Sequence, residues 1–235
     1  MAVEEVPVLT IDGPSGAGKG AVSAAVARAL GWHALDSGAV YRSIALAALE
    51  RAVAPEEESA LVALARSVHL TFRAGADGID VYLDDRDVGD SLRTEAVSVM
   101  ASRVAAIPAL RAALLELQRA YRRRPGLVAD GRDMGTIVFP DAGLKVFLEA
   151  SVEERAKRRY KQLKEKGESV MLSRLFRDMQ ARDRRDRERA VAPTVPATDA
   201  VVVDSTRLSL KEVVEHVVGL ARQRFGELAP KETNQ

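Results

Sequence analysis

The stretch GPSGAGKGA, residues 13–21, decides the fold of this chain because it is a glycine-rich loop of the kind that binds phosphate groups. The glycines and the lysine of the pattern G-x-x-x-x-G-K are all present, but Gly20 and Ala21 follow where that pattern continues with serine or threonine. The missing hydroxyl group ordinarily contacts Mg²⁺. The stretch therefore predicts phosphate binding and leaves open how a metal ion is held.

The residues on either side of this loop predict a strand, a loop and a helix. The apolar run at residues 6–11 is typical of a buried strand, and apolar residues at helical spacing predict a helix over residues 19–30 that Gly31 ends. The glycines allow successive N–H groups to point inward, and the helix start adds a partial positive charge. Lys19 adds a full charge for the β- and γ-phosphates. An ordinary glycine turn is the alternative, but the spacing and the flanks favour phosphate binding.

Further short apolar segments predict a parallel sheet that is covered by helices on both faces. These segments lie at residues 32–35, 127–129, 144–148 and 200–203, with helices expected at residues 39–51 and 109–123. Ligands bind such sheets at the carboxyl ends of the strands. Four aspartates fall at or next to these ends: Asp12, Asp36, Asp130 and Asp204. Ser37 is expected to cap the helix over residues 39–51.

One segment departs from this alternation of strands and helices. Residues 68–72 and 79–83 alternate apolar and polar side chains on either side of AGADG, which predicts an antiparallel hairpin. The hairpin is expected to be an insertion between the second strand and the helix over residues 109–123. The fold class is therefore α/β, with a parallel sheet and an inserted subdomain.

Composition excludes several classes of protein. The 235 residues include no cysteine, which excludes disulfides and thiolate metal sites and fits a reducing cytosol. The N-terminal segment MAVEEVPVLTID has no basic region, so no signal peptide is expected. No apolar run approaches the ~20 residues that span a membrane. A net charge of +1 gives no general attraction to nucleic acid.

Two short charged motifs are expected at the ligand-binding edge of the sheet. DGRDMG, residues 130–135, follows a strand end and predicts a tight loop that presents Arg132 and Asp133 to a ligand. The alternative is a plain turn with a local ion pair. In DSGAVYR, residues 36–42, Arg42 is expected near the second turn of a helix, where it either reaches over the strand ends or stays in solvent.

Magnesium is expected to be held indirectly. Gly20 and Ala21 cannot ligate a metal, and Mg²⁺ keeps several waters and often rests on substrate phosphates. Asp130 is the best candidate for a carboxylate behind those waters, and Asp36 is the second. The alternative for Asp130 is a carboxylate that caps a turn. Ser15 offers a hydroxyl group from within the loop.

Arginine is concentrated between residues 154 and 189, where it alternates with Asp and Glu. For most of these arginines an ion-paired, solvated helix is the simplest interpretation. A nucleic-acid surface is disfavoured because the acids oppose phosphate contacts and few aromatic residues are present to stack on bases. The third interpretation is a mobile lid that closes over ATP, since guanidinium groups bind phosphate bidentately.

The histidines His33, His69 and His216 form no evident catalytic cluster. A kinase that acts on a hydroxyl group needs a base, whereas a phosphate acceptor is already largely ionised near neutral pH. The scarcity of bases therefore favours a phosphate acceptor. A base role for Asp36 or Asp133 in a kinase of a small hydroxyl metabolite remains open.

Several motifs together resemble those of the bacterial cytidylate kinases. In order they are IDGPSGAGKG, LDSGAVYR, SRVAAIPALR, DGRDMGTIVFPDA and RDRRDRERAVAP, and the resemblance covers residues 6–225. It implies a cytoplasmic, monomeric enzyme that transfers the γ-phosphoryl group of ATP to CMP or dCMP with Mg²⁺, without nucleic-acid or membrane partners. The alternatives are a P-loop kinase for a small hydroxyl metabolite and an RNA-binding nucleotide switch.

The resemblance also implies a division of the chain and a set of site residues. The P-loop NTPase core, with a five-stranded parallel sheet, would comprise residues of about 6–50, 107–155 and 190–225, with a monophosphate-binding insertion at about 51–106 and a lid at about 156–189. The implied ATP-binding residues are Gly13, Pro14, Ser15, Gly16, Ala17, Gly18, Lys19, Gly20 and Ala21. The implied CMP-binding residues are Ser37, Arg42, Ser102, Arg111, Arg132, Asp133, Arg182, Asp186 and Arg189. The implied catalytic residues are Lys19, Arg42, Arg132 and Arg182.

The implied base-reading residues suit cytosine. Its N4 amino group needs an acceptor such as Asp133, while O2 and N3 need donors such as Ser102 and Arg111. Uracil presents O4 instead, which would leave a buried polar mismatch against an ionised carboxylate. The chain departs from the family pattern at Ala21, where a threonine is usual and an α-phosphate contact is lost. It also departs at Arg184, where an acid is usual, which raises the positive charge of the lid.

Overall fold

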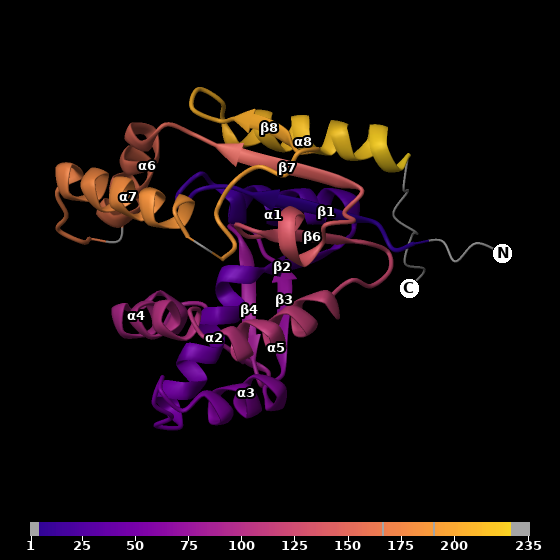
Figure 1. Ribbon diagram of the computed structural model, residues 1–235. Coiled ribbons are helices and arrows are strands. Elements are labelled where there is room, and N and C mark those ends of the chain that lie inside the picture. Colours follow the sequence, from indigo (N-terminus) through magenta and orange to yellow (C-terminus); the bar gives the residue numbers. More distant parts are fainter. Residues whose placement is uncertain (1–4, 166, 190, 227–235) are drawn as a thin grey trace.

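The computed structural model describes residues 5–165, 167–189 and 191–226, and its centre is a five-stranded parallel sheet (Figure 1). The strand order is β2-β6-β1-β7-β8. In chain order the strands are β1 (Val8–Asp12), β2 (His33–Asp36), β6 (Leu127–Asp130), β7 (Leu144–Glu149) and β8 (Val201–Asp204). The α/β class and the five-stranded parallel sheet expected from the sequence are confirmed.

Helices cover both faces of this sheet because its strands are apolar on both sides. Leu9 and Ile11 of β1 belong to the cluster of buried residues that includes α1 (Lys19–Leu30) and α8 (Leu210–Phe225). Val8, on the opposite side of β1, belongs to the cluster that includes α2 (Ser37–Glu50) and α5 (Pro108–Arg119). The alternation along β1 thus places one hydrophobic core on each face of the sheet.

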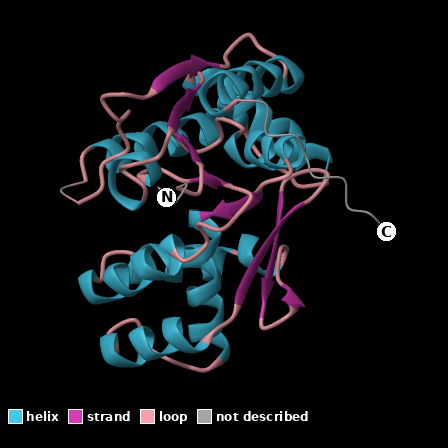
Figure 2. Cartoon of the chain, turned by 90° about the vertical axis from the view of Figure 1, so that its right-hand side faces the viewer, coloured by secondary structure: helices cyan, strands magenta, loops and turns pink. Residues whose placement is uncertain are grey.

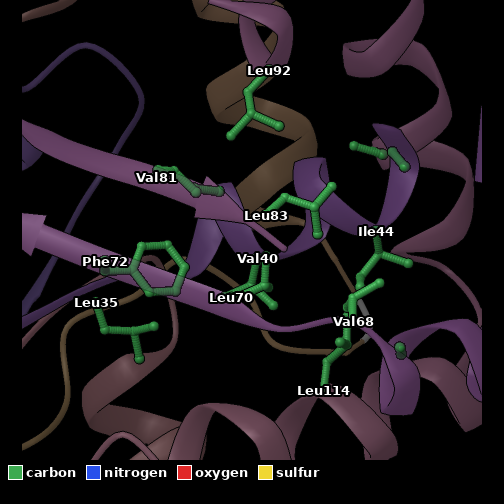
Figure 3. Close-up of a cluster of buried hydrophobic side chains, with 14 of the residues drawn as sticks. Leu35, Val40, Ile44, Val68, Leu70, Phe72, Val81, Leu83, Leu92 and Leu114 are labelled. Carbon is green, nitrogen blue, oxygen red and sulfur yellow. The ribbon is translucent and has the colours of Figure 1, made fainter. Parts of the chain in front are cut away.

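The insertion between α2 and α5 contains the expected antiparallel hairpin and a third, short strand. Its elements are α3 (Glu58–Ser67), β3 (Leu70–Ala74), β4 (Ile79–Leu83), β5 (Arg86–Asp87), η1 (Ser91–Arg93) and α4 (Glu95–Val104). In Figure 2 the hairpin extends away from the large sheet beside the helices of the same half. Figure 3 shows its apolar side chains Phe72, Val81 and Leu83 in one cluster with Val40 and Ile44 of α2.

Two helices form a separate pair beside the carboxyl edge of the sheet (Figure 1). They are α6 (Val152–Glu165) and α7 (Leu172–Arg187), and they pack against each other. Between β6 and β7 a short π-helical turn, η2 (Met134–Val138), follows the DGRD segment. No single helix of the described residues is long and apolar enough to cross a membrane, although α4 and α5 reach that length and composition jointly, across a bend of 103°.

Several element boundaries differ from the sequence expectations. Asp36, not Ser37, caps α2, because Asp36 has an extended backbone and its carboxylate accepts a hydrogen bond from Ala39 N at 2.8 Å. The first hairpin strand lies two residues later than expected, at Leu70–Ala74. Helix α5 ends at Arg119 rather than at residue 123, since the following residues form the turn toward Pro125, which a helix does not accommodate.

Candidate active site

The carboxyl ends of β1, β2 and β6 meet at a cavity of about 400 Å³. Its wall comes from the glycine loop, from the segments after β2 and β6, from the hairpin tip and from the helices α6 and α7. The residues that line it are Ser15, Gly16, Gly18, Lys19, Gly20, Ala21, Asp36, Gly38, Arg42, Asp77, Asp130, Gly131, Arg132, Arg155, Arg158, Arg159, Gln162 and Arg182. Seven of these side chains are cationic and three are carboxylates, so the cavity favours polyanionic ligands.

The glycine loop adopts the curled form expected from its sequence. Gly16 and Gly18 have φ values of 81° and 92°, a region that glycine enters without steric cost. A Cβ atom on Gly13 would lie 2.0 Å from the backbone oxygen of Leu148, so only glycine fits where the loop leaves β1. The loop is therefore tied closely to β7, and α1 begins at Lys19 with its N-terminus toward the cavity.

Lys19 and Asp130 face each other across the floor of the cavity. The Lys19 Nζ donates to the backbone oxygen of Pro14 at 3.1 Å and lies 3.9 Å from Asp130 Oδ1. Burial lowers the pKa of Lys19, although the charge of Asp130 opposes that shift. Burial likewise raises the pKa of Asp130. The charge of each group therefore shifts the pKa of the other. A bound anion or cation changes both pKa values.

The carboxylate of Asp130 lies next to Gly20, the position at which the phosphate-loop pattern has a hydroxyl group. A Cβ atom placed on Gly20 would lie 3.5 Å from Asp130 Oδ2, so the carboxylate stands next to the space that a serine or threonine side chain would use. Asp36 is less available, because its carboxylate caps α2 and accepts from Arg42 Nη2 at 3.2 Å. The described ranges contain no group of three or more His, Cys, Asp or Glu side chains that could hold a metal. The donor set fits a hydrated Mg²⁺ that rests on ligand phosphates.

Asp12 holds the loop that follows β6. Its buried carboxylate accepts hydrogen bonds from Met134 N at 2.9 Å and from Gly135 N at 2.8 Å. Burial raises the pKa of Asp12 to about 6, although these two hydrogen bonds favour the ionised form. The sequence placed Asp12 at the ligand edge of the sheet, but its actual partners are backbone groups of the Arg132–Asp133 loop.

Asp186 on α7 lies close to three of the arginines that were expected at the site. Its side chain is 4% exposed and lies 2.8 Å from Arg132 Nε, 2.6 Å from Arg189 Nη2 and 4.0 Å from Arg182 Nε. Burial lowers the pKa of Arg182 to about 10, and the neighbouring charge of Arg132 adds to that shift. Arg182 and Arg132 line the cavity, whereas Asp186 stands behind them.

Asp133 does not belong to the cavity wall, and its side chain forms an ion pair with Arg111. The two side chains approach to 3.2 Å, and the Arg111 guanidinium stands 5.8 Å from the centroid of the Tyr41 ring. Burial raises the pKa of Asp133, and Arg111 opposes that shift. The Ser102 hydroxyl donates to Ser98 O within α4 at 3.1 Å. Ser37 is buried, and neither serine belongs to the cavity wall.

The structure adds cavity residues that the motifs did not identify. Arg155, Arg158, Arg159 and Gln162 line it from α6, and Asp77 lines it from the β3–β4 turn. The run EERAKRRY signals a basic helix, but its periodicity does not reveal which arginines turn toward the glycine loop. The position of Asp77 depends on the hairpin reaching α1, where Arg28 Nη2 donates to Ala76 O at 3.4 Å.

Comparisons with known proteins cover all of these elements. A family model described as Cytidylate kinase matches residues 9–223. A cytidylate kinase of Aeromonas hydrophila subsp. hydrophila is 54% identical over 223 residues, which are 95% of this chain and 97% of the relative. One of Salmonella arizonae is 56% identical over 219 residues, covering 93% and 96%. One of Methylococcus capsulatus is 58% identical over 213 residues, covering 90% and 95%.

Proposed function

Because the chain belongs to the cytidylate kinase family, it transfers the γ-phosphoryl group of ATP to CMP or dCMP, and we propose that the two nucleotides meet in the cavity at the strand ends. The chain is thus a nucleoside monophosphate kinase. The main support for this location of the nucleotide site is that seven cationic side chains line one cavity together with the glycine loop. No observation favours a hydroxyl acceptor or an RNA-binding switch.

On the donor side, the glycine loop binds the phosphates of ATP. The backbone N–H groups of residues 15–21 and the N-terminus of α1 face the β- and γ-phosphates, and Lys19 releases Pro14 O to contact them. A bound Mg²⁺ would neutralise charge on the phosphates, and Asp130 would hold it through water. Asp36 is the second candidate for that role and is already engaged by Arg42.

On the acceptor side, Arg42 and Arg132 bind the phosphate of CMP. Both line the cavity from segments that directly follow a strand, β2 and β6 respectively. Arg182 lies opposite on α7 and stabilises negative charge on the transferring group together with Lys19. The acceptor phosphate is largely ionised near neutral pH, so the transfer needs positioning and charge neutralisation rather than a base.

The base of CMP is read behind the phosphate site. Asp133 accepts from the cytosine N4 amino group, while Arg111 and Ser102 donate to the ring acceptors. Arg189 lies beside them, and Arg182 and Asp186 contact the ribose, which for Asp186 requires Arg132 and Arg189 to move away from its carboxylate. Ser37 supports the phosphate end from the start of α2. Ser102 reaches the base only if α4 moves toward α5, because its hydroxyl is now bonded within α4.

The division of the chain into core, insertion and lid, at the boundaries given above, belongs to this proposal. The pairing of α6 and α7 beside the cavity supports a lid at about residues 156–189. The enzyme works as a monomer in the cytoplasm without nucleic-acid or membrane partners. The support for a monomer is that a single chain supplies every residue of the proposed site.

Replacement of Asp133 by alanine tests the reading of the base. Asp133→Ala is expected to lower kcat/KM for CMP about 10- to 100-fold, because a buried hydrogen-bond acceptor for N4 is lost. The dissociation constant of ATP, measured by titration without CMP, should stay unchanged. Asp80→Ala, a change of an exposed hairpin residue, is the matched control. Equal losses for CMP and ATP in Asp133→Ala would contradict the assignment.

A further inference from the structure

Arg155 is the largest of the fully buried side chains in the described part of the chain, and it lies directly behind the glycine loop. Its Nε donates to Ala150 O at 3.0 Å and its Nη1 donates to Ser15 O at 2.8 Å. The same guanidinium forms a bidentate pair with Asp183, with Nη1 at 3.1 Å from Oδ1 and Nη2 bonded to Oδ2. Four of the five N–H groups of the guanidinium thus donate hydrogen bonds within the protein.

These contacts join three parts of the site at one point. Ala150 follows β7, Ser15 belongs to the glycine loop, and Asp183 lies on α7. The loop and α7 also pack directly, since a Cβ atom on Gly16 would lie 3.2 Å from Met179 Cε. The pair Arg155–Asp183 therefore fixes the lid helix α7 to the back of the loop that is proposed to bind ATP.

The same helix carries the cavity arginine Arg182 next to Asp183. One turn later, Asp186 on the same face of α7 holds Arg132 from the loop after β6. Helix α7 is thus attached through Asp183 on the donor side and through Asp186 on the acceptor side. Arg182, the residue before Asp183, lines the cavity beside these attachments.

A pair of this kind contributes orientation more than stability. Both charges are almost completely removed from water, at 2% and 9% side-chain exposure, so their attraction is largely offset by lost hydration. The planar, bidentate geometry of a guanidinium–carboxylate contact fixes direction in a way that apolar packing does not. An orienting function explains why a buried ion pair stands at this position.

We infer that Arg155 and Asp183 are positioning residues, which hold α7 so that Arg182 stands over the glycine loop for phosphoryl transfer. The inference rests on the proposed function, because it assigns the two residues to the same cavity. Neither residue is required to touch a substrate. Their effect is expected on the transfer step, where a displacement of about 1 Å can lower a rate about 100-fold.

The test is a double-mutant cycle between Asp183 and Arg182 in the full-length enzyme. Asp183→Asn keeps the size of the side chain and removes its charge. It is expected to lower kcat about 10- to 100-fold and to change the dissociation constant of CMP, measured without ATP, by less than about threefold. Arg182→Met should lower kcat strongly in the wild-type background and only slightly in the Asp183→Asn background, since residues that act as a unit are not additive.

Two further variants complete the experiment. Arg155→Met is expected to reproduce the kcat of Asp183→Asn, with circular dichroism as the check of folding. If Arg155→Met does not fold, the cycle between Asp183 and Arg182 decides the question alone. Arg177→Met is the matched control, because Arg177 is an exposed residue of α7 whose side chain, among the described residues, bonds only the backbone oxygen of Ser173.

Three results would overturn the inference. A wild-type kcat for Asp183→Asn would mean that α7 is placed without the pair. An equal effect of Arg182→Met in both backgrounds would mean that Asp183 does not act through Arg182. A large loss for a folded Arg155→Met beside a normal Asp183→Asn would assign Arg155 to direct phosphate binding. Failure of the proposed function is distinguishable, because the wild-type enzyme would then show no transfer to CMP.

Discussion

Asp12 is a single buried carboxylate that supports the whole loop carrying Arg132 and Asp133. It does so by accepting from two successive backbone N–H groups, those of Met134 and Gly135. A neutral carboxyl or amide group can accept only one of these hydrogen bonds well, because its second polar atom is a donor. The charge state of Asp12 therefore governs how firmly the segment after β6 is held.

This dependence predicts a specific effect of pH. Asp12→Asn resembles the protonated residue and is expected to weaken CMP binding about 10-fold at pH 7.5, the equivalent of one hydrogen bond. The pKa of Asp12 is raised to about 6, mainly by burial, with Asp133 and Lys19 as the charged neighbours. Wild-type protein should therefore lose affinity as pH falls through 6, while Asp12→Asn does not share that loss.

Titration calorimetry at pH 7.5 and pH 5.5 measures the affinity of the wild-type protein and of Asp12→Asn for CMP. The ionisation of CMP itself cancels in the ratio of wild-type to Asp12→Asn affinity, so the ratio should shrink toward one at pH 5.5. A ratio that stays constant over this range would show that the ionised carboxylate of Asp12 does not support the loop.

Lys19 gives a second prediction at this scale. Lys19→Ala should lower kcat at least about 100-fold, because a charge aimed at the transferring group is lost. The fold should survive, since burial already raises the pKa of Asp130 and its carboxyl can take up a proton when its partner is removed. Kinetics with circular dichroism measure both effects, and Lys161→Ala, an exposed change on α6, is the control. An active Lys19→Ala enzyme would remove the phosphate-loop mechanism.

Single residues differ in how far the sequence reveals them. Lys19 and Arg132 could be placed at the cavity because Lys19 begins α1 and Arg132 follows the end of β6, whereas for Arg42, in the second turn of α2, a solvent position was the alternative; the structure brings all three to the cavity. The role of Asp12 could not be predicted, because its partners lie more than 120 residues away in the chain. The same holds for Arg155, whose partner Asp183 becomes its neighbour only when α6 and α7 pair.

At the scale of elements, the insertion and the core share buried side chains. Leu83 of β4 is almost fully buried and packs near Val40 and Ile44 of α2 (Figure 3). The hairpin is therefore expected to unfold together with α2 rather than as an independent unit.

Leu83→Ala tests this coupling. The change is expected to lower the free energy of unfolding by about 2–5 kcal/mol through lost burial and a new cavity, with a single transition. Urea unfolding followed by circular dichroism and by Trp32 fluorescence measures it, because Trp32 lies in the core while Leu83 lies in the insertion. Val99→Ala, at an exposed position of α4, should change stability by less than about 0.5 kcal/mol. Separate transitions for the two probes would contradict a shared core.

The sequence predicted whether a segment forms a helix or a strand better than it predicted the residues at which the segment begins and ends. The helix over residues 19–30 was placed correctly, because a glycine loop begins it and Gly31 ends it in a left-handed conformation. The cap of α2 was assigned wrongly to Ser37, since a serine and an aspartate in sequence are both good caps and only the backbone angles decide between them. The third strand of the insertion is only two residues long and carries no periodic signal.

At the scale of the whole molecule, the chain brings the glycine loop, the segment after β6 and the helices α6 and α7 together around one cavity. The order of apolar strands and helices was enough to predict the parallel sheet and the edge at which the cavity lies. The packing of α6 against α7 was not predictable in this way. Helices α6 and α7 are strongly charged, so they show no wide apolar face from which packing could be inferred.

The measurement that tests the account most directly is ADP release by the wild-type enzyme with ATP and Mg²⁺. CMP, dCMP, UMP, AMP and GMP are compared as acceptors at equal concentration, with shikimate as a hydroxyl acceptor. We predict strong turnover with CMP and dCMP and little with the others, because the proposed role of Asp133 is to accept from the cytosine amino group and to oppose the uracil oxygen. Equal turnover with UMP and CMP would contradict the role proposed for Asp133. The absence of ADP release with every monophosphate would contradict phosphoryl transfer in this cavity.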